Sequence, residues 1–369
     1  MTPEEVELLS ELTIVIPTYN RPLELERAIE YWRDLPITIH ILDGSEKPFF
    51  LEGLQSDTQS IYYHSFPSDG ESAKENWSRR LKFGLSLMNT RFSALCCDDD
   101  VFTTDGMIKA LEILDSGSFD AIAGKAGEYL VENDYVVWKH KYPNWKDEER
   151  QKSFNVNERL LFDGGPHAFY AIYKSDKLIK VHSLGHESKF AVPVWKDMLI
   201  INRIKIFCRV KFISDLFWLK CGINYPEARP IKFAQLFWDK NFIDHKKLFV
   251  DNLSSAIQIS EPNMPTATRS ELLDTLVAQF QKPRKSKKVV VKVKAKILEI
   301  LGSLPRTFRK LLFSVLSPDL KKRLGNYDFP VNYSPITSLT EYDLASPSLK
   351  NWEQILLMPR EELRLRANI

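Results

Sequence analysis

The segment "LTIVIPTYNRP" at residues 12–22 predicts a buried strand that runs directly into a helix. Its first half is an almost unbroken apolar run, as in strands that are covered on both faces. Pro22 suits the first turn of a helix, and the apolar residues after it recur at the spacing of one helical face, namely Leu25, Ala28, Ile29 and Trp32. A strand followed at once by a helix is the repeating unit of a parallel α/β sheet.

The same alternation continues along the first third of the chain. Short apolar runs predict strands at 37–45, 61–66 and 92–97, and helical periodicity predicts a helix at 72–88. The segment "EYLVENDYVVW" at 128–138 then predicts a hairpin, which requires antiparallel pairing. We therefore expect an α/β fold with a mixed sheet flanked by helices.

The composition changes at about residue 262, within the Pro- and Thr-containing connector "EPNMPTATRS" at 261–270. We expect a catalytic domain over 1–261 and a mainly helical, basic extension over 262–369. Residues 282–323 hold 14 Lys or Arg against two acids, a net charge of +12. This segment either lies on an anionic membrane surface or packs on the catalytic domain with a solvated basic face. It has no recognisable nucleic-acid-binding module, so we expect no nucleic-acid partner.

The cysteines and the N-terminus bear on the compartment. Four cysteines in a chain of 369 residues form neither a disulfide framework nor a zinc-ligand spacing. The N-terminal segment "MTPEEVELLS" lacks the basic and apolar regions of a signal peptide. No uncharged run approaches the roughly 18 apolar residues that span a bilayer. We expect a cytoplasmic protein, or one bound peripherally at the inner face of the plasma membrane.

Three aspartates, Asp98, Asp99 and Asp100, follow the predicted strand at 92–97. Open α/β sheets bind ligands beyond the carboxyl ends of their strands, and three buried like charges need a cation or solvent to neutralise them. In an extended segment, Asp98 and Asp100 would point the same way and converge on one hard divalent ion. A solvated acidic turn that caps the next helix is the alternative.

Three segments, in order, resemble the family-two glycosyltransferases of the GT-A fold: "IVIPTYNRP" at 14–22, "ILDGS" at 41–45, and the strand that ends in the three aspartates. The resemblance covers residues 12–105 well and 160–220 loosely, and it implies a Rossmann-like mixed sheet. The residues that it assigns to the nucleotide are Pro17, Thr18, Tyr19, Asn20, Arg21, Asp43, Asp98 and Asp99. It assigns a bound Mn²⁺ or Mg²⁺ to Asp98 and Asp100, or to Asp99 in an alternative register.

Further site residues come from the same resemblance. It makes Asp197 the catalytic base at the start of a helix, although Lys196 stands where relatives commonly have Glu. Asp163 is a second candidate base, and His167 in "LLFDGGPHAFYAIY" is a candidate donor to a hydroxyl or a phosphate.

Two more basic side chains have alternative interpretations. Lys82 stands where relatives often have Asn, and it either offsets diphosphate charge or is an ordinary solvated lysine. His245 is a candidate third metal ligand.

The activity implied is metal-dependent, inverting transfer of a sugar from a nucleotide-sugar, with UDP-sugar the first expectation. The implied acceptor is a glycan or a lipid-linked acceptor in bacterial surface polysaccharide synthesis. One alternative is a sugar nucleotidyltransferase, which would carry a Gly-rich phosphate loop where this chain has "PTYNRP". The other is a non-catalytic glycan- or membrane-binding protein with a degenerate transferase domain.

Overall fold

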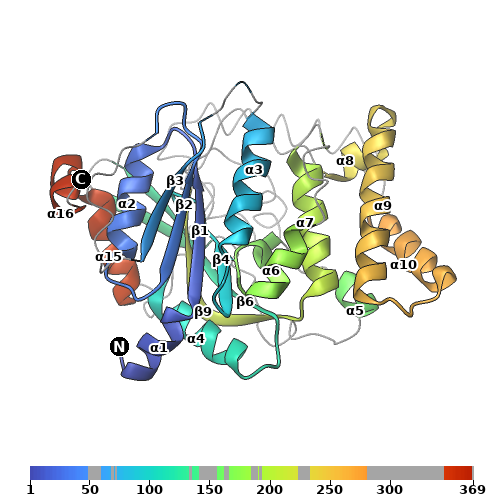
Figure 1. Ribbon diagram of the computed structural model, residues 1–369, viewed down its shortest axis with the longest axis horizontal. Helices are drawn as coiled ribbons and strands as arrows, with labels where there is room; N and C mark the ends of the chain where they lie inside the picture. The colour runs from blue at the N-terminus through green and yellow to red at the C-terminus, as the bar shows by residue number, and fades with distance from the viewer. Residues whose placement is uncertain are drawn as a thin grey trace, which may run out of the picture.

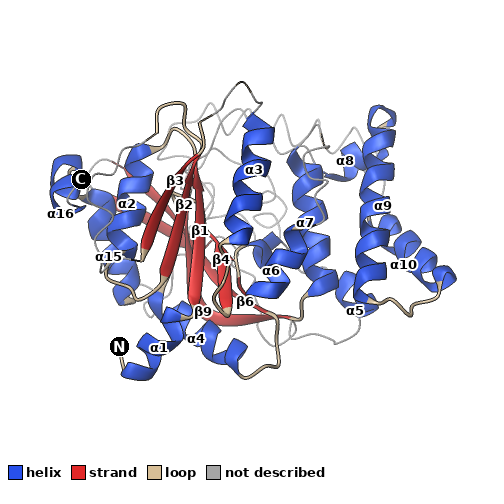
Figure 2. Cartoon of the chain, viewed as in Figure 1, coloured by secondary structure: helices blue, strands red, loops and turns tan. Residues whose placement is uncertain are grey.

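The computed structural model describes most of the first 280 residues and a C-terminal segment. The described residues are 1–48, 60–67, 70, 73–132, 135–140, 156–161, 166–183, 190, 193–222, 233–280 and 345–367. Their centre is a nine-stranded mixed sheet with helices on both faces (Figure 2). The predicted fold class is therefore confirmed.

The first half of the sheet is parallel, in the order β3-β2-β1-β4. Its strands are β1 (Leu12–Thr18), β2 (Thr38–Asp43), β3 (Ile61–Ser65) and β4 (Phe92–Leu95). Two helices match the predicted ones, α2 (Pro22–Trp32) and α3 (Ala73–Ser86). Because all four strands run the same way, the segments after β1, β2 and β4 meet at one edge of the sheet.

The second half of the sheet mixes strand directions. Beyond β4 the order is β8-β6-β9-β5, with β7 paired to β6 as the predicted hairpin. These strands are β5 (Val101–Phe102), β6 (Ala121–Glu132), β7 (Tyr135–His140), β8 (Ile172–Lys174) and β9 (Val210–Cys221). The long strand β9 is parallel to β6 and antiparallel to β5, so its end lies beside the segment between β4 and β5.

Both faces of the sheet are buried, which explains the continuous apolar run of β1. Ile14 and Ile16 belong to one apolar core with α2, whereas Val15 belongs to a second core with Leu85 of α3. Neither face of β1 meets water, so apolar residues occupy successive positions rather than alternate ones.

The remaining helices surround this frame. They are α1 (Pro3–Ser10), α4 (Thr104–Asp115), α5 (Val156–Leu161), α6 (Ser175–His182), α7 (Pro193–Phe207), α8 (Phe233–Trp238), α9 (Ile243–Ser260) and α10 (Thr266–Gln279), with short 3₁₀ segments η2 (Pro166–Phe169) and η4 (Lys240–Phe242). The predicted domain boundary at 261 falls at the C-cap of α9. The next helix, α10, packs back on α9 and α5.

The last described segment returns to the first helix of the sheet. Helices α15 (Pro347–Leu357) and α16 (Arg360–Ala367) lie beside α2, on the side of the sheet opposite to α3 and α7 (Figure 1). Arg27 donates to the Leu356 carbonyl at 2.8 Å, and the Arg360 guanidinium pairs with the buried Glu26 carboxylate at 2.8 and 3.0 Å. The C-terminal helices thus anchor α2 from outside.

The basic segment 282–323 lies outside the described residues, so its two predicted roles stay predictions. Within the described ranges, no helix has both the length and the apolar character required to cross a membrane.

Candidate active site

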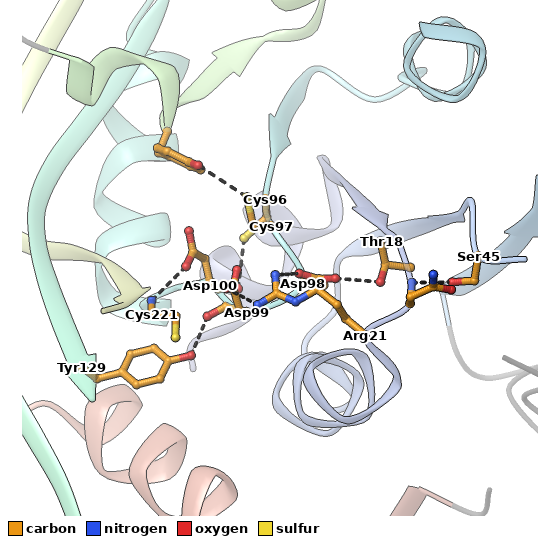
Figure 3. Close-up of polar contacts among 12 residues, drawn as sticks. Thr18, Arg21, Ser45, Cys96, Cys97, Asp98, Asp99, Asp100, Tyr129 and Cys221 are labelled. Carbon is orange, nitrogen blue, oxygen red and sulfur yellow. Dashed lines mark hydrogen bonds and ion pairs between the residues drawn. The ribbon is translucent and has the colours of Figure 1, made fainter. Parts of the chain in front are cut away.

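The three aspartates form a turn rather than an extended segment. The backbone N–H of Asp100 donates to the Cys97 carbonyl at 3.3 Å, which closes a turn between β4 and β5. We call Asp98, Asp99 and Asp100 the acidic turn. Side chains alternate in direction only along a strand, so the turn directs the carboxylates of Asp98 and Asp99 to Arg21 and that of Asp100 to β9 (Figure 3).

Asp98 joins the end of β1 to the acidic turn. Its carboxylate accepts from Thr18 Oγ1 at 2.7 Å and from Arg21 Nη1 at 2.7 Å. Arg21 Nη2 donates to Asp99 Oδ2 at 2.6 Å, so one guanidinium bridges two carboxylates. Burial raises the pKa of Asp98 to about 6, against the opposing effect of the Thr18 and Arg21 donors.

Asp100 faces β9 instead. Its carboxylate accepts from Trp218 Nε1 at 3.1 Å and from the backbone N–H of Cys221 at 3.0 Å. Burial, and then the charge of Asp99, raise the pKa of Asp100 to about 7. The Trp218 indole is itself buried and stacked on Tyr170, with ring centroids 3.9 Å apart. Trp218 is thus a positioning residue for the acidic turn.

Asp43 ends β2 and is fully engaged by neighbouring side chains. One carboxylate oxygen accepts from the backbone N–H of Ser45 at 2.8 Å and from the Ser45 hydroxyl, and the other accepts from Tyr63 at 2.5 Å. The Ser45 hydroxyl oxygen also accepts from the backbone N–H of Asn20 at 2.7 Å. Asn20 has a φ of 54°, a left-handed conformation that asparagine tolerates better than most residues. Ser45 therefore links the segments that follow β1 and β2.

Arg80 of α3 contacts the carboxyl ends of both β1 and β2. It is buried, and its Nη1 donates to the carbonyls of Thr18 at 2.7 Å and Leu42 at 2.9 Å. Gly44 permits this approach, because a Cβ there would lie 2.6 Å from Arg80 Cζ. Arg80 lies one helical turn before Gly84, which packs closely against Leu42 and Val15. That spacing is the signal in the sequence that Arg80 faces the sheet.

The acidic turn also contains the group of side chains best placed for a metal. Among the described residues, Cys97 Sγ and one oxygen each of Asp99 and Asp100 lie within 4.8 Å of one another. Burial raises the pKa of the Cys97 thiol well above its usual range, and sulfur is a soft ligand that Mg²⁺ and Mn²⁺ do not prefer. The two carboxylates are the hard oxygen ligands that Mg²⁺ and Mn²⁺ prefer, so the residues present fit such an ion.

This group contains only part of the predicted ligand set. Asp98 lies outside it, because the turn directs its carboxylate to Thr18 and Arg21. His245 also lies outside it, on α9, where its ring packs near Phe190 and Trp195. Of the two registers suggested for the triplet, the structure groups Asp99 with Asp100.

The predicted base lies in a different setting. Asp197 is the fifth residue of α7 and has an exposed side chain, yet the surrounding protein raises its pKa, and the charge of Lys196 opposes that rise. Lys196 Nζ lies 4.7 Å from the ring centroid of Trp77 on α3. Asp163 is outside the described residues, and His167 lies in η2 with a side chain outside the described part of the structure.

Three other predicted nucleotide residues lie near the carboxyl end of β1 or on α3. Pro17 is half-buried in β1, whereas the Tyr19 ring that follows β1 is 41% exposed. Lys82 is exposed on α3. Sequence reasoning gave no role to Ser45, Tyr63 or Arg80 and did not place Trp218 at the acidic turn, because these roles depend on contacts between distant segments.

The chain is similar to one protein family and to several solved structures. Residues 13–179 match the model of glycosyl transferase family 2. The crystal structure of S. aureus TarS 1–349 is 11% identical, with 95% of this chain and 91% of that chain covered and a TM-score of 0.46. The structure of S. aureus TarS 1–349 in complex with UDP is 12% identical, with 95% of this chain and 91% of that chain covered and a TM-score of 0.46. The structure in complex with UDP-GlcNAc is 12% identical, with 95% of this chain and 92% of that chain covered and a TM-score of 0.45. No curated protein matches.

The matched range includes the end of β1, Asp43 and the acidic turn, which are the parts that the hydrogen bonds above bring together. The chain is therefore a glycosyltransferase whose residues 13–179 belong to glycosyl transferase family 2.

Proposed function

We propose that this glycosyltransferase moves a sugar from a UDP-sugar to a hydroxyl of a glycan or lipid-linked acceptor, with Mn²⁺ or Mg²⁺ and with inversion at the anomeric carbon. The observation that carries the proposal is the contact of Thr18 and Arg21 with Asp98 and Asp99. It joins the end of the first strand to a set of carboxylates at the sheet edge where α/β folds bind ligands.

The nucleotide has suitable partners at this edge. The exposed Tyr19 ring offers a face for a base, and Asp43 is linked through Ser45 to Asn20, the residue that follows Tyr19. The Arg21 guanidinium matches the paired oxygens of a diphosphate. Arg80 and Ser45 hold these segments in place before a ligand arrives, which lowers the entropic cost of binding.

Asp99 and Asp100 would hold the divalent ion. When bound, such an ion supplies positive charge that stabilises the departing nucleoside diphosphate. Trp218 and the Cys221 backbone N–H orient the Asp100 carboxylate, so this ligand is fixed by β9 rather than by the turn alone.

Asp197 would remove the proton of the acceptor hydroxyl. A raised pKa makes a carboxylate a stronger base, provided that it is still ionised at the working pH. One displacement with one base inverts the anomeric configuration, so no second carboxylate nucleophile is required. Asp163 is the second candidate for this role.

Differential scanning fluorimetry with a panel of nucleoside diphosphates, with and without Mn²⁺, tests the proposal. A ligand that binds only the folded state raises the melting temperature by mass action, so we expect a Mn²⁺-dependent rise with UDP. Asp99→Asn should remove the Mn²⁺-dependent part of that rise. No rise with any diphosphate would contradict the proposal and favour a non-catalytic binding protein.

A further inference from the structure

We propose that Arg21 is a tethered counter-ion of the acidic turn, which disfavours binding of a divalent cation until a nucleoside diphosphate takes over its guanidinium. The inference rests on the proposed function, and it assigns Arg21 a second task beyond contact with the nucleotide. Cation binding would then follow or accompany nucleotide binding rather than precede it.

The geometry of Arg21 is that of a substitute cation. Nη1 lies 2.7 Å from Asp98 Oδ1, and Nη2 lies 2.6 Å from Asp99 Oδ2, so both ends of the guanidinium fork are engaged by carboxylates (Figure 3). The carboxylates are well covered, with side-chain exposures of 4% and 17%, which strengthens their attraction to the fork. Asp99 also belongs to the group that fits a metal, so a guanidinium and a divalent ion compete for one carboxylate.

The Arg21 side chain reaches solvent, whereas its backbone is held at the start of α2. The side chain is 26% exposed, and Arg21 is the residue just before α2, where it makes no side-chain cap. Helix α2 itself is fixed from its outer side through Arg27, Glu26 and the C-terminal helices. A guanidinium exchanges carboxylate for phosphate oxygens readily because both present paired oxygens to its planar fork.

Asp98 would keep a partner after the exchange. Thr18 Oγ1 donates to Asp98 Oδ2 independently of Arg21, so departure of the guanidinium leaves this buried carboxylate hydrogen-bonded. Asp99 would lose its only charged partner among the described residues and become available to the incoming cation. The two binding events are therefore coupled through one side chain, and such coupling is reciprocal.

Electron paramagnetic resonance titration of Mn²⁺ into the full chain, with and without UDP, tests the inference. We expect UDP to tighten Mn²⁺ binding to the wild type by about tenfold or more, a typical size for coupling between sites. Arg21→Gln removes the charge, so without UDP it should bind Mn²⁺ about tenfold tighter than the wild type, with the effect of UDP reduced to about threefold or less.

Arg33→Gln is the matched control, because Arg33 ends the same helix and pairs with Glu30 at 2.7 Å, away from the acidic turn. It should behave as the wild type. Arg21→Lys keeps the charge but cannot bridge both carboxylates, so without UDP it should also bind Mn²⁺ more tightly than the wild type. This second variant decides the matter if Arg21→Gln does not fold.

Two results would overturn the inference in different ways. If the wild type binds Mn²⁺ with UDP but the Arg21 variants bind Mn²⁺ without UDP no tighter than the wild type, the counter-ion role is wrong and the proposed function stands. If the wild type binds no Mn²⁺ even with UDP, the metal dependence in the proposed function fails, and the inference fails with it.

Discussion

The acidic turn and the N-terminal part of α7 both carry aspartates that we assign to the reaction, and they are held in opposite ways. Each carboxylate of the acidic turn accepts from a side chain or backbone group of β1, β9 or Arg21. Asp197, by contrast, is exposed, and no described residue donates a hydrogen bond to it. The acidic turn, which we call the organised end of the site, is thus held by the sheet itself. The position of the proposed base Asp197, which we call the base end, depends on one helix, α7.

The largest expected effect tests the base end. Asp197→Asn should lower kcat by about 10²–10⁴-fold, the usual contribution of a general base. Nucleotide affinity should stay within about twofold of the wild type, because Asp197 is absent from the network around Thr18 and Asp43. A transfer assay and calorimetric titration of UDP would measure the two quantities.

Asp176→Asn is the control for this substitution. Asp176 is also an exposed aspartate near the start of a helix, the neighbouring α6, and its loss should leave kcat unchanged. Full turnover by the Asp197 variant would reject Asp197 as the base and move the role to Asp163.

The second prediction tests the organised end. Arg80→Met removes the guanidinium that donates to the carbonyls of Thr18 and Leu42, although the Thr18 carbonyl keeps the backbone N–H of Gly44 at 3.1 Å. We expect a loss of about 1–3 kcal/mol in the free energy of unfolding, the usual cost of a lost buried hydrogen-bond partner, and weaker UDP binding. Urea denaturation and calorimetry would measure them.

Arg79→Met is the matched control. Arg79 is the exposed neighbour of Arg80, and water can replace the hydrogen bond that it donates to the Pro67 carbonyl. It should cost no more than about 0.5 kcal/mol, as for most surface substitutions. Equal losses for the two variants would show that the strand ends do not depend on Arg80.

The third prediction concerns the strands beneath the organised end. His40 of β2 lies against His64 of β3, with ring nitrogens 3.1 Å apart, and Tyr62 stacks on it. Burial, and then the charge of His64, lower the pKa of His40 to about 4. The folded state therefore binds fewer protons than the unfolded state between about pH 6.5 and 4, so this residue's contribution to stability is present above pH 6.5 and lost as the pH falls toward 4.

His40→Gln should remove that contribution. The wild type should lose about 1–2 kcal/mol more than the variant between pH 7 and 5, a figure kept below the full shift because local relaxation and solvent screening weaken the effect of burial. Urea denaturation of both proteins at the two pH values measures this difference. Identical pH dependence would mean that His40 is already solvated and contributes nothing of this kind.

The smallest expected effect concerns Lys82. This side chain is exposed on α3, whereas Arg80 on the same helix is buried against the strand ends. Lys82→Ala should change UDP affinity by less than about threefold, because a solvated charge is well screened. A tenfold loss in calorimetric titration would instead place Lys82 at the diphosphate.

The parallel half of the sheet could be predicted from the sequence because its signals are local. A continuous apolar run placed β1, and helical periodicity placed α2 and α3, within a few residues of their observed bounds. A mainly helical C-terminal extension was predicted, but the packing of α15 and α16 on α2 was not, because that contact joins segments more than 300 residues apart in the chain.

The site shows the same limit at the level of side chains. The resemblance brought Thr18, Arg21 and the aspartates into one site, but the alternation rule failed for Asp98 and Asp100 because a backbone turn replaces the strand there. Trp218 and Arg80 act through contacts that only the assembled sheet creates, so no local pattern assigns their partners.

The most direct test of the central claim is a crystal structure of the wild-type protein with UDP and Mn²⁺. The account predicts a manganese ion bound by Asp99 and Asp100, with the Arg21 guanidinium moved from the carboxylates to the diphosphate. An Arg21 that still bridges Asp98 and Asp99, with the nucleotide bound elsewhere or absent, would contradict it.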